Sequence, residues 1–360
     1  MTMFRWTPEQ VAAIGRGPHP VAPRFAADQA PRVTPGLDLW DHWPVLTPEG
    51  ALAEVAGGLL VVALTAPIFA DPEERHGHAR LRLLHRGRAG WRDLGDLLPD
   101  GLSPGSREWA GSTILERDGR LTLYFTAAGQ RGEPVTSFDQ RLFACTIALD
   151  TAARPIDWSP PAELVAPDGA VYETAMAGGG AVGTIKAFRD PCYLQDGDDE
   201  WLLFAASRAG STSPWNGLVG AARRSGGAWR LEDPWVDATG VNNELERPHA
   251  LRHRGALYLF WSTQRKVFAP ELRPAPTGLY GVVRLPGTAA WRPINGSGLV
   301  FANPDQAPAQ AYSWQVLPDL TVWSFADRIA PAGGERAAPS FAGAPAPVLS
   351  LRLEGDRASL

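Results

Sequence analysis

The chain has 360 residues, enough for one large domain or two ordinary ones. Hydrophobic residues make up 44% and charged residues 20%, a balance that excludes a disordered, collagen-like or coiled-coil chain. The formal net charge of −5 provides no basic field to hold a phosphate backbone, so we expect no nucleic-acid partner.

Residues 1–30 are rich in proline and alanine, and we expect an N-terminal arm with one short helix over residues 7–14. Thr7 can cap this helix, and Pro8 fits its first turn. The N-terminus lacks the apolar core of a signal peptide, and no run approaches the roughly 18 apolar residues of a membrane span. We therefore expect a protein that is cytoplasmic or secreted by a signal-independent route, with no membrane partner.

Short apolar runs separated by turn clusters dominate the rest of the chain and predict β-strands. The clearest runs cover residues 58–65, 121–126, 142–149, 201–206, 256–262, 278–284, 321–325 and 348–353. No comparable helical pattern lies between them, which excludes a parallel β–α–β architecture and leaves an all-β sandwich, barrel or propeller. Strand pairs recur at roughly 50–70 residues, the size of a four-stranded blade, so about five blades fit, with a large sandwich still open.

Few residues suggest a metal or cofactor. Cys145 and Cys192 are too few for a disulfide framework or a zinc site, and both lie in apolar runs that predict buried free thiols. His76 and His78 have no third ligand nearby, which favours an exposed loop. The glycine-rich segment 177–183 is not a phosphate-binding loop and is expected to be a loop before the segment Phe-Arg-Asp-Pro. We expect no metal and no cofactor.

Four segments place a carboxylate beside aromatic residues or arginine. They are Leu-Asp-Leu-Trp-Asp-His-Trp-Pro from residue 37, Glu-Trp-Ala-Gly-Ser from 108, Phe-Arg-Asp-Pro from 188 and Asn-Glu-Leu-Glu-Arg-Pro-His from 243. Each alone could be a capped loop or a surface turn. On an extended strand, Glu244 and Glu246 would share one face and Arg247 would point the other way. A glycosidase needs two or three carboxylates close together, and carboxylates from separate blades could meet at one end of a propeller axis.

These segments, followed by TGLYGVV, NGSGLV and AYSW, form an ordered set that resembles glycoside hydrolase family 68 from about residue 37 to about residue 330. That family contains levansucrases, inulosucrases and bacterial β-fructofuranosidases, which act on sucrose. The resemblance implies a bacterial enzyme in which residues 31–360 form a single five-bladed β-propeller catalytic domain with a central active-site funnel.

The resemblance also implies roles for individual residues. Asp41 matches the nucleophile, Glu246 the general acid/base and Asp190 the transition-state stabiliser. The substrate-binding positions are Trp40, Trp109, Arg189, Glu244, Arg247, Gln264 and Tyr312, with Trp40 and Trp109 as aromatic walls and Arg247 expected to orient Glu246 and Glu244.

Three positions depart from the family pattern. Ala110 stands where relatives usually carry a serine whose hydroxyl lies close to the nucleophile. Gln264 and Trp314 stand where polymer-making relatives usually carry arginine or histidine, and we expect these two residues on the glucose and acceptor side.

The sequence thus predicts a retaining sucrose-cleaving enzyme that passes fructose to water or small sugar acceptors, a β-fructofuranosidase or fructosyltransferase. The alternatives are a levansucrase that makes fructan polymer, a furanosidase of another family on a similar propeller, and a non-catalytic sugar-binding propeller. The oligomeric state is left open.

Overall fold

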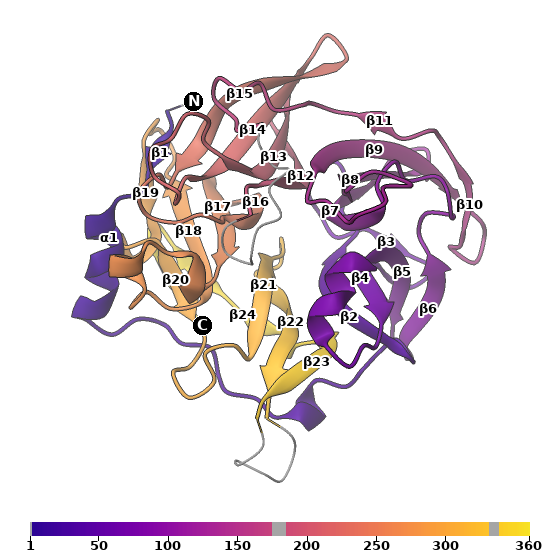
Figure 1. Cartoon of the computed structure of the whole chain (residues 1–360), viewed down its shortest axis with the longest axis horizontal. Coiled ribbons are helices and arrows are strands. Elements are labelled where there is room, and N and C mark those ends of the chain that lie inside the picture. The colour runs from indigo at the N-terminus through magenta and orange to yellow at the C-terminus, as the bar shows by residue number, and fades with distance from the viewer. Residues whose placement is uncertain (1, 175–184, 331–337) are drawn as a thin grey trace.

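The computed structural model describes residues 2–174, 185–330 and 338–360, so the glycine-rich segment 177–183 lies outside the described residues. Five antiparallel sheets stand in a ring around a central axis and follow one another in chain order (Figure 1). The expected all-β five-bladed propeller is confirmed. In each blade the first strand lies nearest the axis, and later strands lie progressively further out.

The strand bounds of the five blades are as follows. Blade 1 contains β2 (Leu37–Pro44), β3 (Glu54–Val55), β4 (Gly58–Pro67), β5 (Arg80–Gly87) and β6 (Gly90–Asp96). Blade 2 contains β7 (Arg107–Leu115), β8 (Leu121–Ala128), β9 (Gln140–Leu149), β10 (Pro155–Trp158) and β11 (Ala162–Glu163). Blade 3 contains β12 (Phe188–Asp196), β13 (Asp199–Ser207), β14 (Gly217–Ser225) and β15 (Ala228–Asp237), with β1 (Phe4–Arg5) added at its edge. Blade 4 contains β16 (Glu246–His253), β17 (Ala256–Thr263), β18 (Gly278–Arg284), β19 (Trp291–Pro293) and β20 (Leu299–Ala302). Blade 5 contains β21 (Ala311–Val316), β22 (Thr321–Ile329), β23 (Ser340–Pro345) and β24 (Leu349–Ser350), and β25 (Arg352–Glu354) pairs with β26 (Arg357–Ser359).

Helical structure is short and peripheral. The described helices are α1 (Pro8–Ala12) and the 3₁₀ turns η1 (Ala13–Arg16), η2 (Ala27–Gln29), η3 (Pro72–Gly77), η4 (Arg265–Val267), η5 (Pro270–Leu272) and η6 (Ile294–Gly296). Within the described ranges, none is long and apolar enough to cross a membrane.

All eight apolar runs lie in strands, but the last is divided. The run 348–353 is split into β24 and the start of β25 at Leu351, whose backbone N–H donates to the carbonyl of Leu320 instead of continuing one ladder. The sequence therefore located the apolar segments correctly and missed one break.

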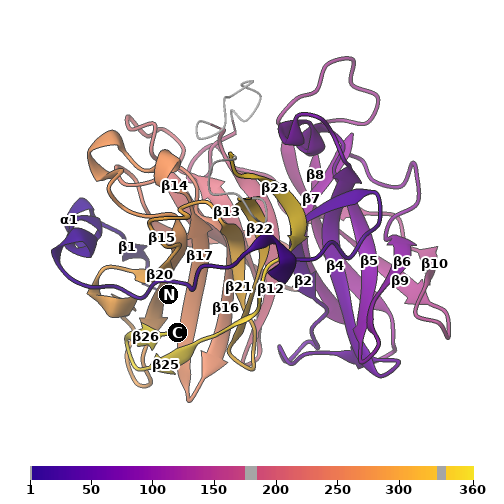
Figure 2. The same cartoon turned by 90° about the horizontal axis from the view of Figure 1, so that it is seen from below.

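The N-terminal arm packs against the outer side of the ring. Strand β1 pairs in parallel with β15, and Thr7 caps α1 as expected, in a capping box that Gln10 completes. Trp6 is 1% exposed and packs against Trp261, Phe268 and Tyr280 of blade 4. Further along, Val21 bridges to Ala302, and the arm then crosses to β2 (Figure 2). The arm thus contacts blades 3 and 4 before the chain enters blade 1.

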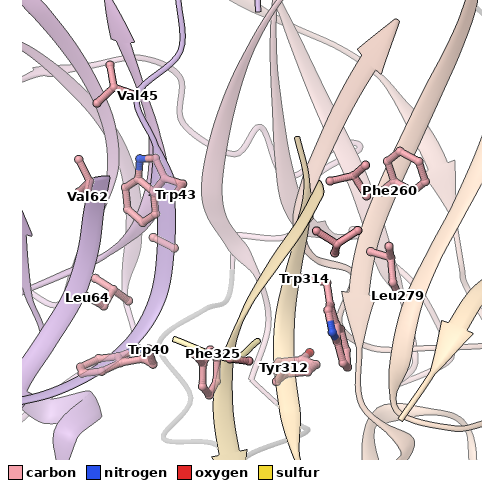
Figure 3. Close-up of a cluster of buried hydrophobic side chains, with 14 of the residues drawn as sticks. Trp40, Trp43, Val45, Val62, Leu64, Phe260, Leu279, Tyr312, Trp314 and Phe325 are labelled. Carbon is pink, nitrogen blue, oxygen red and sulfur yellow. The ribbon is translucent and has the colours of Figure 1, made fainter. Parts of the chain in front are cut away.

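Apolar side chains fill the space between neighbouring blades. Trp40 and Trp43 project from β2, and Tyr312 and Trp314 project from β21, with Phe325 nearby (Figure 3). This packing fixes the first strands of the blades relative to one another, and those strands carry the candidate site.

Candidate active site

The innermost strand of every blade breaks its register at one place. The shifts lie between Leu39 and His42, Trp109 and Gly111, Arg189 and Cys192, Glu246 and His249, and Tyr312 and Gln315. The residues at these five bulges include Asp41, Ala110, Asp190, Arg247 and Ser313. A β-bulge re-aims the side chains around it, so the repeated bulge turns one stretch of each inner strand toward the site.

Three of the bulge residues adopt left-handed backbone conformations. The φ angle is +62° at Asp190, +50° at Arg247 and +59° at Ser313. Asp190 and Arg247 each precede a proline, and a pre-proline residue ordinarily prefers extended backbone. Such conformations persist only where the surroundings hold them, and they cluster at functional sites.

Asp190 is held by the neighbouring blades on both sides. Its backbone N–H donates to Oγ1 of Thr126 at 2.9 Å, and its Oδ2 accepts the backbone N–H of Arg247 at 3.1 Å. Burial, followed by the charges of Glu246 and Asp41, raises the pKa of Asp190 to about 7, against the lowering effect of Arg189. The Asp190 carboxylate is therefore fixed in place, and a positive charge placed nearby would favour its ionised form.

Arg189 forms ion pairs with acidic side chains of blades 3 and 4. One guanidinium nitrogen, Nη2, lies 2.8 Å from Oε1 of Glu246 and 3.4 Å from Oε2 of Glu244, and Nε lies 3.8 Å from Oδ2 of Asp190. Burial opposes the charge of Arg189, but these three carboxylates outweigh it and raise the pKa of the guanidinium. Arg189 is thus the cation that the three carboxylates share.

Glu246 reaches the site from the start of β16, and its side chain is 20% exposed. Besides the contact with Arg189, its Oε2 accepts a short hydrogen bond from the hydroxyl of Tyr312. Two donors from two other blades therefore fix the orientation of the Glu246 carboxyl group.

Glu244 lies close to Glu246, as expected, but not because the two residues share a face of one strand. It lies before β16 and not on a face of the strand, and its backbone N–H donates to Oδ1 of Asn242 at 2.8 Å. Burial, followed by the charge of Glu246, raises the pKa of Glu244 to about 7. The period-of-two argument was wrong because the strand begins only at Glu246, although the two carboxylates do share Arg189.

Asp41 lies at the bulge of β2 and is partly accessible. Burial raises its pKa, and the charge of Glu246 adds to this effect. The positive charge of Arg247, a hydrogen bond from the Ser313 hydroxyl and the charge of His76 act in the opposite direction. The ionisation of Asp41 is therefore coupled to the acid and the arginine of blade 4, Glu246 and Arg247.

Arg247 contacts a different part of the site from the one expected. Its Nη1 donates to the carbonyl of His42 at 3.3 Å and to Oγ of Ser313 at 3.4 Å, and its Nη2 donates to Oε1 of Gln315 at 3.2 Å. The guanidinium also lies over the ring of Trp43, 5.0 Å from its centroid. These contacts place Arg247 beside Asp41. Arg189, and not Arg247 as expected, holds Glu246 and Glu244.

The two aromatic positions differ in exposure. Trp40 is 3% exposed and packs its edge against His76. Trp109 is partly exposed and lies against Phe138, and its indole N–H is buried without a partner among the described residues. A sugar hydroxyl is one group that could accept from this N–H.

Gln264 and Trp314, expected on the same side of the substrate, lie in different surroundings. Gln264 is partly exposed, follows β17 and precedes η4. Trp314 is 1% exposed and makes an edge contact with the ring of Phe301. It makes a second edge contact with the ring of Tyr312 (Figure 3). Its expected place on the acceptor side is wrong, because the bulge at Ser313 turns Trp314 into the core.

Three residues near the acids were not proposed as site residues. Thr126 links two bulges, because it donates to the carbonyl of Ala110 and accepts from the N–H of Asp190. His76 is 42% exposed, as expected, but it lies in the 3₁₀ turn η3, with its ring against that of Trp40, the neighbour of Asp41. The third, Ser313, is one of the left-handed bulge residues. An alignment of the five inner strands at the bulge, with Ser313 at the position of Asp41, would have pointed to Ser313. No local sequence pattern marks Thr126.

The site contains the carboxyl groups that acid–base and nucleophilic catalysis require. Its acids are paired with arginines, and among the described residues no group of three or more histidine, cysteine or carboxylate side chains could hold a metal ion. Cys145 is a buried free thiol, and Cys192 is a partly buried one.

Comparisons with known proteins agree with this architecture. A levansucrase of Pseudomonas syringae pv. actinidiae is 31% identical over 94% of this chain and 86% of its own length, and one of Erwinia amylovora is 30% identical over 89% and 85%. An inulosucrase from Halalkalicoccus jeotgali, solved with kestose bound, superposes with a TM-score of 0.88 at 34% identity and covers 99% of this chain and 95% of that one. The levansucrase of Bacillus subtilis shares the fold, with a TM-score of 0.83 at 19% identity over 99% of this chain and 94% of that one. The sequence model of the Levansucrase/Invertase family matches residues 2–217 and 213–360. The chain therefore belongs to glycoside hydrolase family 68, the levansucrase and invertase family.

Proposed function

We propose that this protein is a retaining enzyme that cleaves sucrose through a fructosyl-enzyme intermediate and passes the fructosyl unit to water or small sugar acceptors. The observation that carries the proposal is the meeting of three carboxylates from three blades, Asp41, Asp190 and Glu246, around two buried arginines. Family membership supports it, as do relatives named levansucrase and a similar inulosucrase solved with kestose.

In the first step, the Asp41 carboxylate attacks C2 of the fructosyl unit while Glu246 gives its proton to the departing glycosidic oxygen of glucose. Arg247 and Ser313 stabilise the ionised form of Asp41. Arg189 and Tyr312 fix the direction of the Glu246 carboxyl group. The products of this step are glucose and a fructosyl ester on Asp41.

In the second step, Glu246 accepts a proton from water or from an acceptor hydroxyl, and that oxygen attacks C2 and releases Asp41. Two displacements at one carbon restore the original configuration. The accessible part of the Glu246 carboxyl group allows such an acceptor to approach.

Asp190 would act on the sugar in both steps. The ring gains positive charge in each transition state, and an anion held beside its hydroxyl groups binds the transition state more tightly than the ground state. The contacts from Thr126 and the Arg247 backbone hold Asp190 ready for this role.

A second candidate is a levansucrase that builds fructan polymer. The relatives at 30–31% identity bear that name. Gln264 argues against polymer synthesis, because an uncharged side chain stands where polymer makers usually place arginine or histidine. A non-catalytic sugar-binding propeller would not need all three carboxylates and is the weaker alternative.

The experiment measures glucose and fructose release from sucrose by the wild-type protein and by the variants Asp41→Asn, Glu246→Gln and Asp190→Asn. Glu108→Gln is the matched control. Glu108 is also a buried carboxylate paired with an arginine, but its partner is Arg80 of β5 and not an arginine of the acidic cluster. We expect turnover to fall by several orders of magnitude in the first two variants, with melting temperatures that show a folded chain.

The stereochemistry provides the second readout. With methanol as acceptor, nuclear magnetic resonance should show an early fructoside with the same anomeric configuration as the fructosyl unit of sucrose. Absence of sucrose cleavage by the wild-type protein would overturn the proposal in favour of a binding propeller, and an inverted product would exclude the double displacement.

A further inference from the structure

Lys186 lies two residues before β12 and joins three segments of the chain. Its ammonium group donates to the carbonyl of Pro214 and to Oδ1 of Asn216, each at 2.6 Å, and to Oδ1 of Asn243 at 2.9 Å. Pro214 and Asn216 lie between β13 and β14, and Asn243 lies before β16. These three acceptors match the three N–H donors of an ammonium group. Lys186 therefore ties the start of β12, which carries Asp190, to the segment that leads into blade 4.

Lys186 also determines how the side-chain amide of Asn243 is turned. A lysine can only donate, so the amide oxygen of Asn243 must face it. The amide nitrogen then points the other way, where it lies 3.1 Å from the carbonyl oxygen of Ile185 and 3.4 Å from Oε1 of Glu244. Asn243 is 1% exposed, and its backbone N–H donates to the carbonyl of Val267 at 3.0 Å. The amide is therefore fixed in the orientation that presents its N–H groups to Glu244.

The carboxylate of Glu244 lies between this amide and Arg189. Its Oε1 accepts from Nδ2 of Asn243. Its Oε2 lies 3.4 Å from Nη2 of Arg189, and the same nitrogen lies 2.8 Å from Oε1 of Glu246. The two acids thus compete for one guanidinium nitrogen. Because Asn243 supplies Glu244 with a second donor, the shorter contact of Arg189 stays with Glu246.

We infer that Lys186 is a positioning residue of the acidic cluster, because it turns the Asn243 amide toward Glu244. The amide holds the Glu244 carboxylate in place, and Arg189 is left to orient Glu246. The consequence for catalysis rests on the proposed function, in which Glu246 is the general acid/base.

Charged and titratable groups face Glu244 from several elements. They are Lys186, Arg189 of β12, Glu246 of β16, Lys266 of η4 and Tyr312 of β21. The Asn243 amide is a neutral donor among them, and it lowers the pKa of Glu244 against the raising effect of burial. Loss of that donor would destabilise the ionised carboxylate and raise its pKa further.

The experiment compares Asn243→Ala with the matched control Asn216→Ala. Both asparagines are buried, and both accept a hydrogen bond from Lys186. They differ in the second contact, because Nδ2 of Asn216 donates to the carbonyl of Arg208 at 2.7 Å and Nδ2 of Asn243 faces Glu244. A loss of melting temperature common to both variants belongs to the link with Lys186. An effect found in Asn243→Ala alone belongs to Glu244.

Lys186→Met tests the lysine itself, since it removes the charge and the three donors from a side chain of similar length. If this variant does not fold, Asn243→Ala still tests the inference with Lys186 and its other two hydrogen bonds in place.

The first readout needs no turnover. The ¹³C carboxyl resonance of Glu244, assigned by its loss in Glu244→Gln, should titrate roughly half to one pH unit higher in Asn243→Ala and in Lys186→Met, the effect of one lost hydrogen bond. It should move little in Asn216→Ala. The double variant of Lys186→Met with Asn243→Ala should shift little further than Asn243→Ala alone. Summed shifts in the double variant would show that the lysine acts by its charge and not through the amide, which would overturn the inference.

The second readout is sucrose turnover. We expect kcat to fall about tenfold in Asn243→Ala and Lys186→Met, because the Glu246 carboxyl group is misdirected, and to change less than twofold in Asn216→Ala. Equal losses of kcat in the two asparagine variants would reduce Lys186 to a structural link and contradict the inference.

An unshifted Glu244 resonance in folded Asn243→Ala would also overturn the inference, even if sucrose cleavage by the wild type upheld the proposed function. A shifted resonance in a protein that does not cleave sucrose would retain the positioning of Glu244 and reject the proposed function instead.

Discussion

The backbone N–H of Arg247 donates to Oδ2 of Asp190 across 3.1 Å, so the bulge of blade 4 holds the carboxylate of blade 3. The same Arg247 sends its side chain to Ser313 on blade 5, and Thr126 on blade 2 holds the backbone of Asp190. The bulges of four blades are thereby joined by hydrogen bonds. The acidic centre therefore depends on the ring being closed, because each carboxylate is positioned by groups from other blades.

Thr126 offers a test of this linkage. Thr126→Val keeps the shape of the side chain but leaves the N–H of Asp190 without its acceptor. We expect the free energy of unfolding to fall by about 1–3 kcal/mol and kcat to fall about tenfold, because the left-handed Asp190 loses a support. Chemical denaturation and sucrose assays give the two values.

The control for this variant is Thr122→Val on the same strand, where the hydroxyl bonds to Glu116 far from the acids. Equal losses of kcat in the two variants would show that Thr126 has no particular role at the site.

The buried acids predict how stability depends on pH. Burial raises the pKa of Glu108, Glu244 and Asp190 to about 7 and that of Asp327 to about 6. Because these acids bind protons more tightly in the folded chain, the stabilisation is complete below their unfolded pKa values near 4 and is lost as pH rises toward about 7. The free energy of unfolding, measured by urea denaturation, should therefore decline between about pH 5 and pH 7.

Glu108→Gln should reduce this decline, since it removes one of the four groups, whereas Glu163→Gln on the exposed strand β11 should not. A free energy of unfolding that rises through this interval would show that the ion pairs with Arg80 and Arg189 outweigh burial.

Trp6 tests whether the N-terminal arm contributes to the stability of the ring. Its ring is buried among three aromatic side chains of blade 4, and its N–H donates to the carbonyl of Ser297 at 3.0 Å. Trp6→Ala should cost about 3–5 kcal/mol of unfolding free energy, and Trp6→Phe should cost distinctly less. A loss below about 1 kcal/mol in Trp6→Ala would mean that the arm is only loosely attached.

The prediction about product size rests on Gln264, because Trp314 is a core residue. The wild-type protein in concentrated sucrose should place most fructosyl units on water or small sugars. Gln264→Arg should raise the share of ethanol-precipitable fructan severalfold, because a charged donor would hold a growing chain at the acceptor side. Abundant polymer from the wild type would instead support the levansucrase alternative.

The sequence predicted the outer strands better than the inner ones. Runs such as β4 and β18 are buried on both faces and appear as continuous apolar stretches. The inner strands β12 and β16 carry Arg-Asp-Pro and Glu-Arg-Pro, so they resemble turns, and only the ordered set of motifs revealed them. The contacts of Arg247 and Trp314 could not be predicted, because a bulge changes which face each following residue takes.

The proposed mechanism requires a covalent bond between Asp41 and the fructosyl unit. The most direct measurement is rapid acid quenching of the enzyme during sucrose turnover, followed by peptic digestion and mass spectrometry. We expect a single fructosyl adduct on the peptide that contains Asp41, and this adduct should be absent in Asp41→Asn. An adduct on Asp190 or Glu246 instead, or turnover of sucrose with inversion and no adduct, would contradict it.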